Sequence, residues 1–195
     1  MNMDPWHPER PAELGRLFER IGRLGFWIQF VLLVLTVIFG LWVFSMRPAS
    51  DAAAGVGLRN VLSFSSLAVL VFTTYWCRRY AAVGPRIASE TERPTFARVK
   101  KMLWTGLWAG ALGAFLSLGL LIGAVGRMMF LMLANPQVGM MIAPAIGDQS
   151  ISAIDALSMM ALLLMLGAEL IVVALTLWLL YRSTAQLRAA PERRE

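Results

Sequence analysis

The sequence is poor in the residues that most catalytic and metal sites require. It contains one cysteine, Cys77, and one histidine, His7, so no internal disulfide is possible and no CxxC pair exists for metal or redox chemistry. It also has no glycine-rich phosphate loop, no nucleophile elbow and no HExxH helix. We therefore expect a protein that is not an enzyme and that carries no cofactor.

Charged residues are also few, and the sequence contains long apolar runs. Only 15% of the residues are charged, whereas 58% are hydrophobic and the mean hydropathy is +0.64. A water-soluble domain of this size cannot bury so much apolar surface, but a lipid bilayer can, at roughly 20 apolar residues per helical span. The sequence thus predicts an all-α integral membrane protein, a bundle of four transmembrane helices at about 24–46, 61–77, 102–125 and 157–181.

The segment before the first span predicts an amphipathic helix. Residues 1–10 are polar and interrupted by prolines, and residues 182–195 form a basic tail. Between Pro11 and the first span, apolar residues recur at helical spacing and charged residues occupy the other faces. We expect this helix, within residues 1–23, to lie in the headgroup layer. Its apolar positions are Leu14, Leu17, Phe18, Ile21 and Leu24.

The basic residues indicate which side each end of the chain occupies. Of the 18 lysines and arginines, all but Arg47, Arg59 and Arg127 lie in the N-terminal segment, between the second and third spans, or in the tail. The positive-inside rule then places both termini in the cytoplasm, in an inner membrane of the cytoplasmic or thylakoid type. The net charge of +6 is explained by anionic headgroups rather than nucleic acid. Candidate contacts to lipid or to an acidic partner are Arg78, Arg79, Lys100 and Lys101.

Glu169 is the strongest single functional signal. It lies in the middle of the fourth span, where residues 156–180 contain no other charged residue. An ionisable group there costs several kcal/mol unless it is paired, hydrated or protonated, so it is a candidate to exchange a proton or bind a cation. The alternative is a structural role, in which a neutral Glu169 is hydrogen-bonded to a serine or threonine of the second span.

Small residues along the third span predict a helix-packing strip. Gly106, Gly110, Gly113 and Ser117 fall on one face, and Gly119 and Gly123 form a second pair. Glycines at this spacing let another helix approach closely. Whether that helix belongs to the same chain is left open by the spacing.

The segment 126–156 is unusually apolar for a connection outside the membrane. We expect the third helix to leave the membrane near Gly123, Gly126 and Arg127, and the following residues to lie on the outer surface, re-enter the bilayer or cover a partner. Eight methionines between Met128 and Met165 are compatible with Cu(I) binding, or with adaptable apolar packing. The identity of any metal ligand stays open.

Three short stretches carry a resemblance to a known family. They are Arg20–Gln29 (RIGRLGFWIQ), Ser152–Asp155 (SAID) and Leu175–Leu180 (LTLWLL). They resemble a four-helix family of cyanobacterial membrane proteins of unknown function and the chloroplast inner-envelope protein described both as a Tic translocon component and as a permease. The resemblance implies transport or translocation. Members of that family have amides and a histidine in the last span, where this chain has Met159–Met165 and, near the expected histidine, Glu169.

Two functional hypotheses follow. One is an oligomeric permease for a metal or another cation, with Glu169 in the path. The other is a non-transporting accessory or assembly subunit of a larger photosynthetic or translocation complex, which docks through the glycine strip and the apolar 126–156 segment. Beyond lipid, the expected partner is either a second copy of the chain or another membrane subunit.

Overall fold

The computed structural model describes residues 11–45, 58–89, 94–134 and 153–188, and these residues form an all-helical protein. Its four helices are α1 (Pro11–Ser45), α3 (Leu58–Ala88), α4 (Phe96–Ala134) and α5 (Ala153–Arg188). Each contains a stretch long and apolar enough to cross a bilayer. The predicted fold class of four transmembrane helices is therefore confirmed. Residues 1–10, 189–195 and most of the predicted 126–156 connection, including its methionines Met140 and Met141, fall outside the described residues, as do His7 and Ser152.

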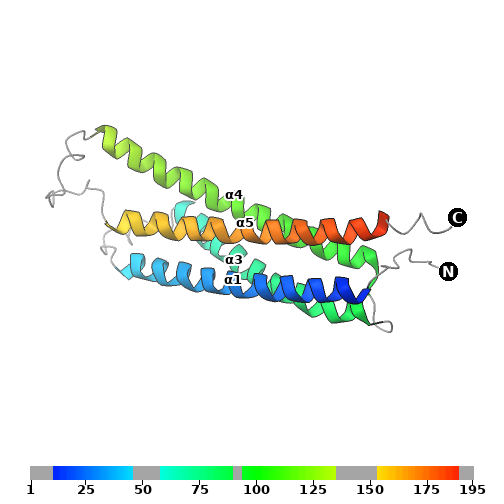
Figure 1. Cartoon of the computed structure of the whole chain (residues 1–195). Coiled ribbons are helices and arrows are strands. Elements are labelled where there is room, and N and C mark those ends of the chain that lie inside the picture. Colours follow the sequence, from blue (N-terminus) through cyan, green and yellow to red (C-terminus); the bar gives the residue numbers. More distant parts are fainter. Residues whose placement is uncertain (1–10, 46–57, 90–93, 135–152, 189–195) are drawn as a thin grey trace.

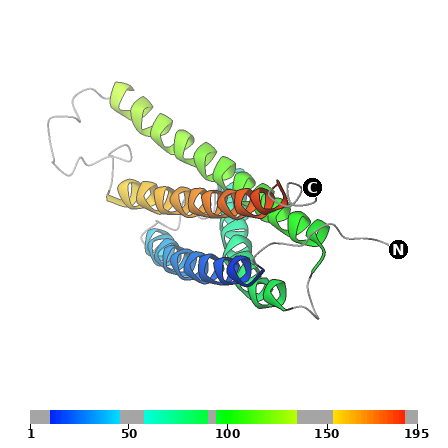
Figure 2. The same cartoon turned by 45° about the vertical axis from the view of Figure 1, so that its right-hand side comes forward.

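The helices run side by side in alternating directions, so that α1 begins and α5 ends at the same end of the bundle (Figure 1). We call this end the basic end, because exposed Arg16, Arg79 and Arg182 lie near it. α1 packs between α3 and α5, and α4 packs against α5 and α3. α3 and α5 contact each other less extensively and face each other across the middle of the bundle. In the view of Figure 2, α3 runs behind α5 and α1 at a steep angle to both.

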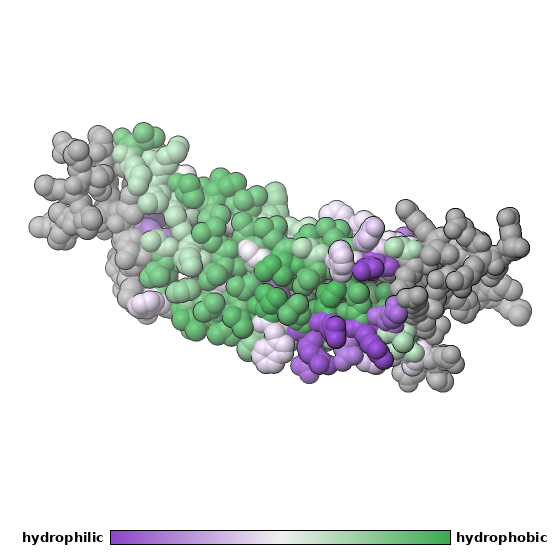
Figure 3. Space-filling view, viewed as in Figure 1, coloured by the Kyte–Doolittle hydropathy of each residue, from purple (hydrophilic) through white to green (hydrophobic). Residues whose placement is uncertain are grey.

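The surface of the bundle is suited to lipid. A broad hydrophobic band covers the middle of the described helices, and hydrophilic residues gather toward the basic end (Figure 3). Large apolar side chains such as Trp108, Phe115 and Phe64 are 68–72% exposed. Such exposure would promote aggregation in water. In a bilayer it is the expected arrangement, because lipid tails are as apolar as the side chains themselves.

Buried residues recur every three or four positions, as in other antiparallel helix bundles. On α4, for example, the buried positions are Val99, Leu103, Gly106, Gly110, Gly113 and Ser117. This pattern places one narrow stripe of each helix in the core. The four stripes leave the remaining faces to lipid.

α1 and α3 approach each other closely because small residues meet at their contact. A Cβ atom at Gly22 would collide with the backbone of Ala81, and one at Gly15 would lie 2.5 Å from the carbonyl oxygen of Gly84. Gly25 follows one turn later against Cys77 and Leu175. Close approach of this kind increases van der Waals contact between membrane helices, which stabilises them where the hydrophobic effect cannot.

The predicted interfacial helix before the first span is not confirmed, because residues 11–45 form one continuous helix. Leu14 and Phe18 from its apolar face are 2% and 0% exposed. They pack in a cluster to which the other three helices all contribute, with Tyr80, Ile87, Val99, Leu103 and Leu179. The helices thus extend beyond the apolar spans at this end and cover the face that was expected to meet lipid.

Gly123, Gly126 and Arg127, the predicted exit of the third helix from the membrane, do not interrupt the helix. α4 continues to Ala134 and has 39 residues, about 58 Å at 1.5 Å per residue. Glycine weakens a helix without ending it, and the first strong breaker is Pro136, which disfavours helix in the residue before it. No described residue of α4 beyond Ser117 is buried. In both views this part of α4 diverges from the other helices (Figures 1 and 2).

Candidate intramembrane site around Glu169

Glu169 lies at the centre of the bundle. Its side chain is 0% exposed, in the middle of α5, and it points toward α3 and α4. The hydroxyl oxygen of Thr73 on α3 lies 3.3 Å from Oε1 of Glu169 and 3.1 Å from the carbonyl oxygen of Leu70. Because a hydroxyl has one proton, Thr73 can donate to one of these two oxygens at a time.

The second carboxyl oxygen has no partner among the residues that the structure describes. Glu169 Oε2 is buried and accepts no hydrogen bond there. In the same part of the chain, no lysine or arginine lies within ion-pair distance of Glu169. A charged carboxylate with one shared hydroxyl partner is costly in apolar surroundings, so binding a proton or another cation stabilises the site.

The predicted glycine strip of α4 is what makes room for this carboxyl group. A Cβ atom at Gly113 would lie 2.5 Å from Cδ of Glu169, and one at Gly106 would overlap the hydroxyl of Tyr80. Gly110 faces Val172 and Val173 on α5. The strip therefore packs against α3 and α5 of the same chain. Within the described chain nothing lies within 4 Å of a Cβ at Gly119 or Gly123, so the second glycine pair has no such role.

Three polar contacts between α3 and α5 follow one another along the bundle axis, and we call them the polar ladder. Ser66 donates to the sulfur of Met165 at 2.9 Å, Thr73 contacts Glu169, and the hydroxyls of Tyr80 and Thr176 are 3.4 Å apart. Ser66, Thr73 and Tyr80 are seven residues apart on α3, so each lies two turns after the last. At 1.5 Å per residue the ladder spans about 21 Å, most of the hydrocarbon thickness.

The end of the polar ladder at Ser66 is joined to α4 by a hydrogen bond. The hydroxyls of Ser66 and Ser117 are 2.8 Å apart. Because Ser66 donates to Met165, Ser117 donates to Ser66. The last residue of the predicted strip thus takes part in hydrogen bonding rather than in close helix packing alone.

Gln29 is a residue of the site that the sequence interpretation did not single out. It is fully buried on α1, and its amide nitrogen donates to the backbone carbonyl of Ala168, the neighbour of Glu169. Its Oε1 atom, like Oε2 of Glu169, has no partner in the described part of the chain. The available signal was a single amide in an otherwise apolar span, in register with Gly22 and Gly25.

The four basic residues predicted to contact lipid or a partner lie away from Glu169, at the basic end. Arg78 and Arg79 belong to α3 and Lys100 and Lys101 to α4, and all four are exposed at the basic end. The Arg79 guanidinium lies 4.6 Å from the centre of the Trp76 ring, a cation–π contact. The helices thus occupy most of what was expected to be a loop. Across the described residues, no three His, Cys, Asp or Glu side chains are placed to hold one metal ion.

The model of a protein family of unknown function, DUF3611, matches residues 8–184. No curated protein and no solved structure matches the chain significantly. The match covers α1, α3 and α4, α5 as far as Thr184, and the whole polar ladder.

Proposed function

Since the chain belongs to the DUF3611 family, a family of unknown function, we propose its role from the geometry of its core: it is a small permease for a cation, and Glu169 binds that cation within the membrane. The observation that carries this proposal is the buried carboxyl group, which has one shared hydroxyl partner and a second oxygen without any in the described chain. Intramembrane carboxyl groups of this kind are typical of ion and proton paths.

A proton is the cation that the polar ladder fits best. Each hydroxyl of the ladder can donate one proton and accept another, and the carboxyl group can hold one. Thr73 and Tyr80 are seven residues apart on α3, about 10 Å along the axis, which is too far for direct transfer. The proposed path therefore requires water between these groups when the protein is working.

The proposal includes an oligomer and an orientation. The centre of the single bundle is filled by packed side chains, which leaves no channel for a cation larger than a proton. For such a cation, we propose that several copies of the chain together enclose the path. We place the basic end in the cytoplasm, because most of the arginines and lysines lie near it.

The test is Glu169→Gln in proteoliposomes that contain a pH-sensitive dye. The substitution keeps the size of the side chain but removes the carboxyl group, so we expect proton flux to fall at least tenfold. Glu13→Gln, which removes an exposed carboxylate outside the core, is the matched control and should leave flux unchanged. Equal flux in the wild type and in Glu169→Gln would exclude this path.

A second function is favoured by the diverging half of α4. From Leu118 onward this helix has no buried residue in the described chain, and Ile122, Val125 and Phe130 are 49–70% exposed. A bare apolar helix with open glycines is suited to contact another membrane subunit. This observation supports an accessory or assembly subunit of a larger complex.

The two functions predict different cross-linked products at this helix. In a Cys77→Ala background, Gly123→Cys should react with a bismaleimide in native membranes, whereas buried Ser117→Cys should not. A product of twice the chain mass indicates a homo-oligomer, as the permease proposal requires. A product that contains a different chain supports the accessory subunit instead.

A further inference from the structure

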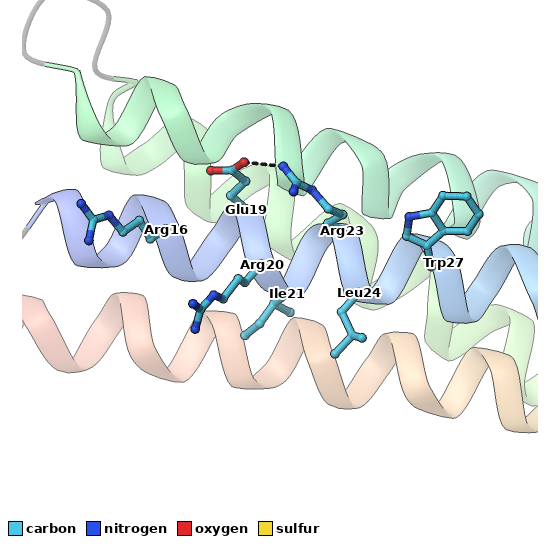
Figure 4. A pocket seen from close by; sticks show the side chains of 7 residues that line it. All are labelled: Arg16, Glu19, Arg20, Ile21, Arg23, Leu24 and Trp27. Atoms are coloured by element: carbon cyan, nitrogen blue, oxygen red, sulfur yellow. Dashed lines mark hydrogen bonds and ion pairs between the residues drawn. The ribbon is translucent and has the colours of Figure 1, made fainter.

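Three arginines and a tryptophan form one exposed face of α1 at the basic end. Arg16, Arg20, Arg23 and Trp27 follow one another at spacings of four, three and four residues, which places them on the same side of the helix. Together with Glu19, Ile21 and Leu24 they line an open hollow on the surface of the bundle (Figure 4). We call it the α1 hollow.

Two of the three guanidinium groups in the α1 hollow are available to a ligand. Arg23 forms an ion pair with Glu19, which neutralises both charges. Arg16 and Arg20 make no hydrogen bond or ion pair with any described residue, and both are exposed. They are one helical turn apart, so their side chains can reach the same anion from two sides. The hollow therefore presents two positive charges.

The same face changes from charged to apolar where the membrane span begins. After Arg23 the exposed residues are Leu24 and Trp27, at 56% and 59% exposure. Trp178 on the adjacent α5 has Arg182 stacked over its ring, the arrangement expected at a headgroup boundary. A ligand of the hollow thus meets guanidinium groups at one end and apolar side chains at the other.

We propose that the α1 hollow binds an anionic phospholipid, with Arg16 and Arg20 holding its phosphate and Leu24 and Trp27 lying along its acyl chain. A free phosphate ion would use the arginines but leave the apolar wall without a partner. The opposite face of the same helix is buried through Leu14 and Phe18, so the bundle itself orients the arginines toward lipid. This site is separate from Glu169 and does not depend on transport.

The experiment measures lipid binding to the purified full chain by native mass spectrometry. Phosphatidylglycerol should occupy a site that phosphatidylcholine does not fill. The double variant Arg16→Gln with Arg20→Gln should weaken phosphatidylglycerol binding roughly twenty-five-fold, at about fivefold for each arginine near the surface. The matched control is Arg86→Gln with Arg98→Gln, which removes the same charge from exposed positions near the same end. The control pair should keep the site.

Other outcomes overturn the proposal. An equal loss in both double variants would show that only overall charge matters. Equal binding of phosphatidylcholine would remove the role of the anionic headgroup, and displacement of the lipid by millimolar inorganic phosphate would show a simple anion site. Retained helical content and elution volume in each variant establish that the protein is folded in every arm.

Discussion

Gly22→Val is expected to lower the free energy of unfolding by about 3 kcal/mol, roughly a hundredfold in the folding equilibrium. A Cβ atom at Gly22 would collide with backbone atoms of Ala81, and backbone cannot rotate away as a side chain can. Valine forces α1 and α3 apart along a contact that also includes Gly15 and Gly84. The measurement is unfolding by sodium dodecyl sulfate in mixed micelles, followed by tryptophan fluorescence.

Gly40→Val on the same helix is the control for this prediction. Nothing in the described chain lies within 4 Å of a Cβ at Gly40, so the substitution carries the intrinsic propensity change of valine without the collision. We expect its unfolding free energy to stay within about 0.5 kcal/mol of wild type. If both variants unfold alike, the close approach of α1 and α3 does not hold the bundle together.

Gly113→Val is expected to cost about 2–3 kcal/mol of unfolding free energy, because the new side chain occupies the space of the Glu169 carboxyl group. The carboxyl carbon is 2.5 Å from the position of the first added atom, and Glu169 is fully buried, so it has no open direction in which to move. The same unfolding assay measures the change. Gly119→Val, six residues later on the open face of α4, should be nearly neutral.

A double-mutant cycle tests whether Glu169 itself causes this effect. In a Glu169→Ala background the space beside Gly113 is free, so Gly113→Val should cost about 2 kcal/mol less than it does in the wild type. Additive costs would mean that valine disturbs some other contact of α4. Such a result would mean that Gly113 does not make room for the carboxyl group of Glu169. The glycine strip would then serve only in helix packing.

Much of the architecture was predictable because a bilayer imposes one strong constraint. A span must be helical and apolar, so hydropathy alone located a segment of each of the four helices. The helix ends were less predictable. α3 continues through Arg78 and Arg79 to Ala88 and α4 reaches Ala134, because a helix ends where its hydrogen bonds end and not where the lipid does.

The candidate site was predictable in part. An isolated acid at mid-span singled out Glu169, and glycine spacing predicted the strip on α4. That these two features meet, with Gly113 against Glu169, depends on how α4 rotates and crosses α5. Gln29 was missed because an amide near the start of a span carries no charge penalty to mark it.

The sequence by itself determined that this chain spans a membrane four times and carries one ionisable group at the middle of its last helix. Only the tertiary structure decided which faces meet: Thr73 with Glu169, Tyr80 with Thr176, and Gly22 with Ala81. The physical reason is that the cost of a polar residue in lipid depends on its chemistry and depth and not on which helix carries it. Which two helices bring their polar or small residues together is set by packing, and packing depends on all four at once.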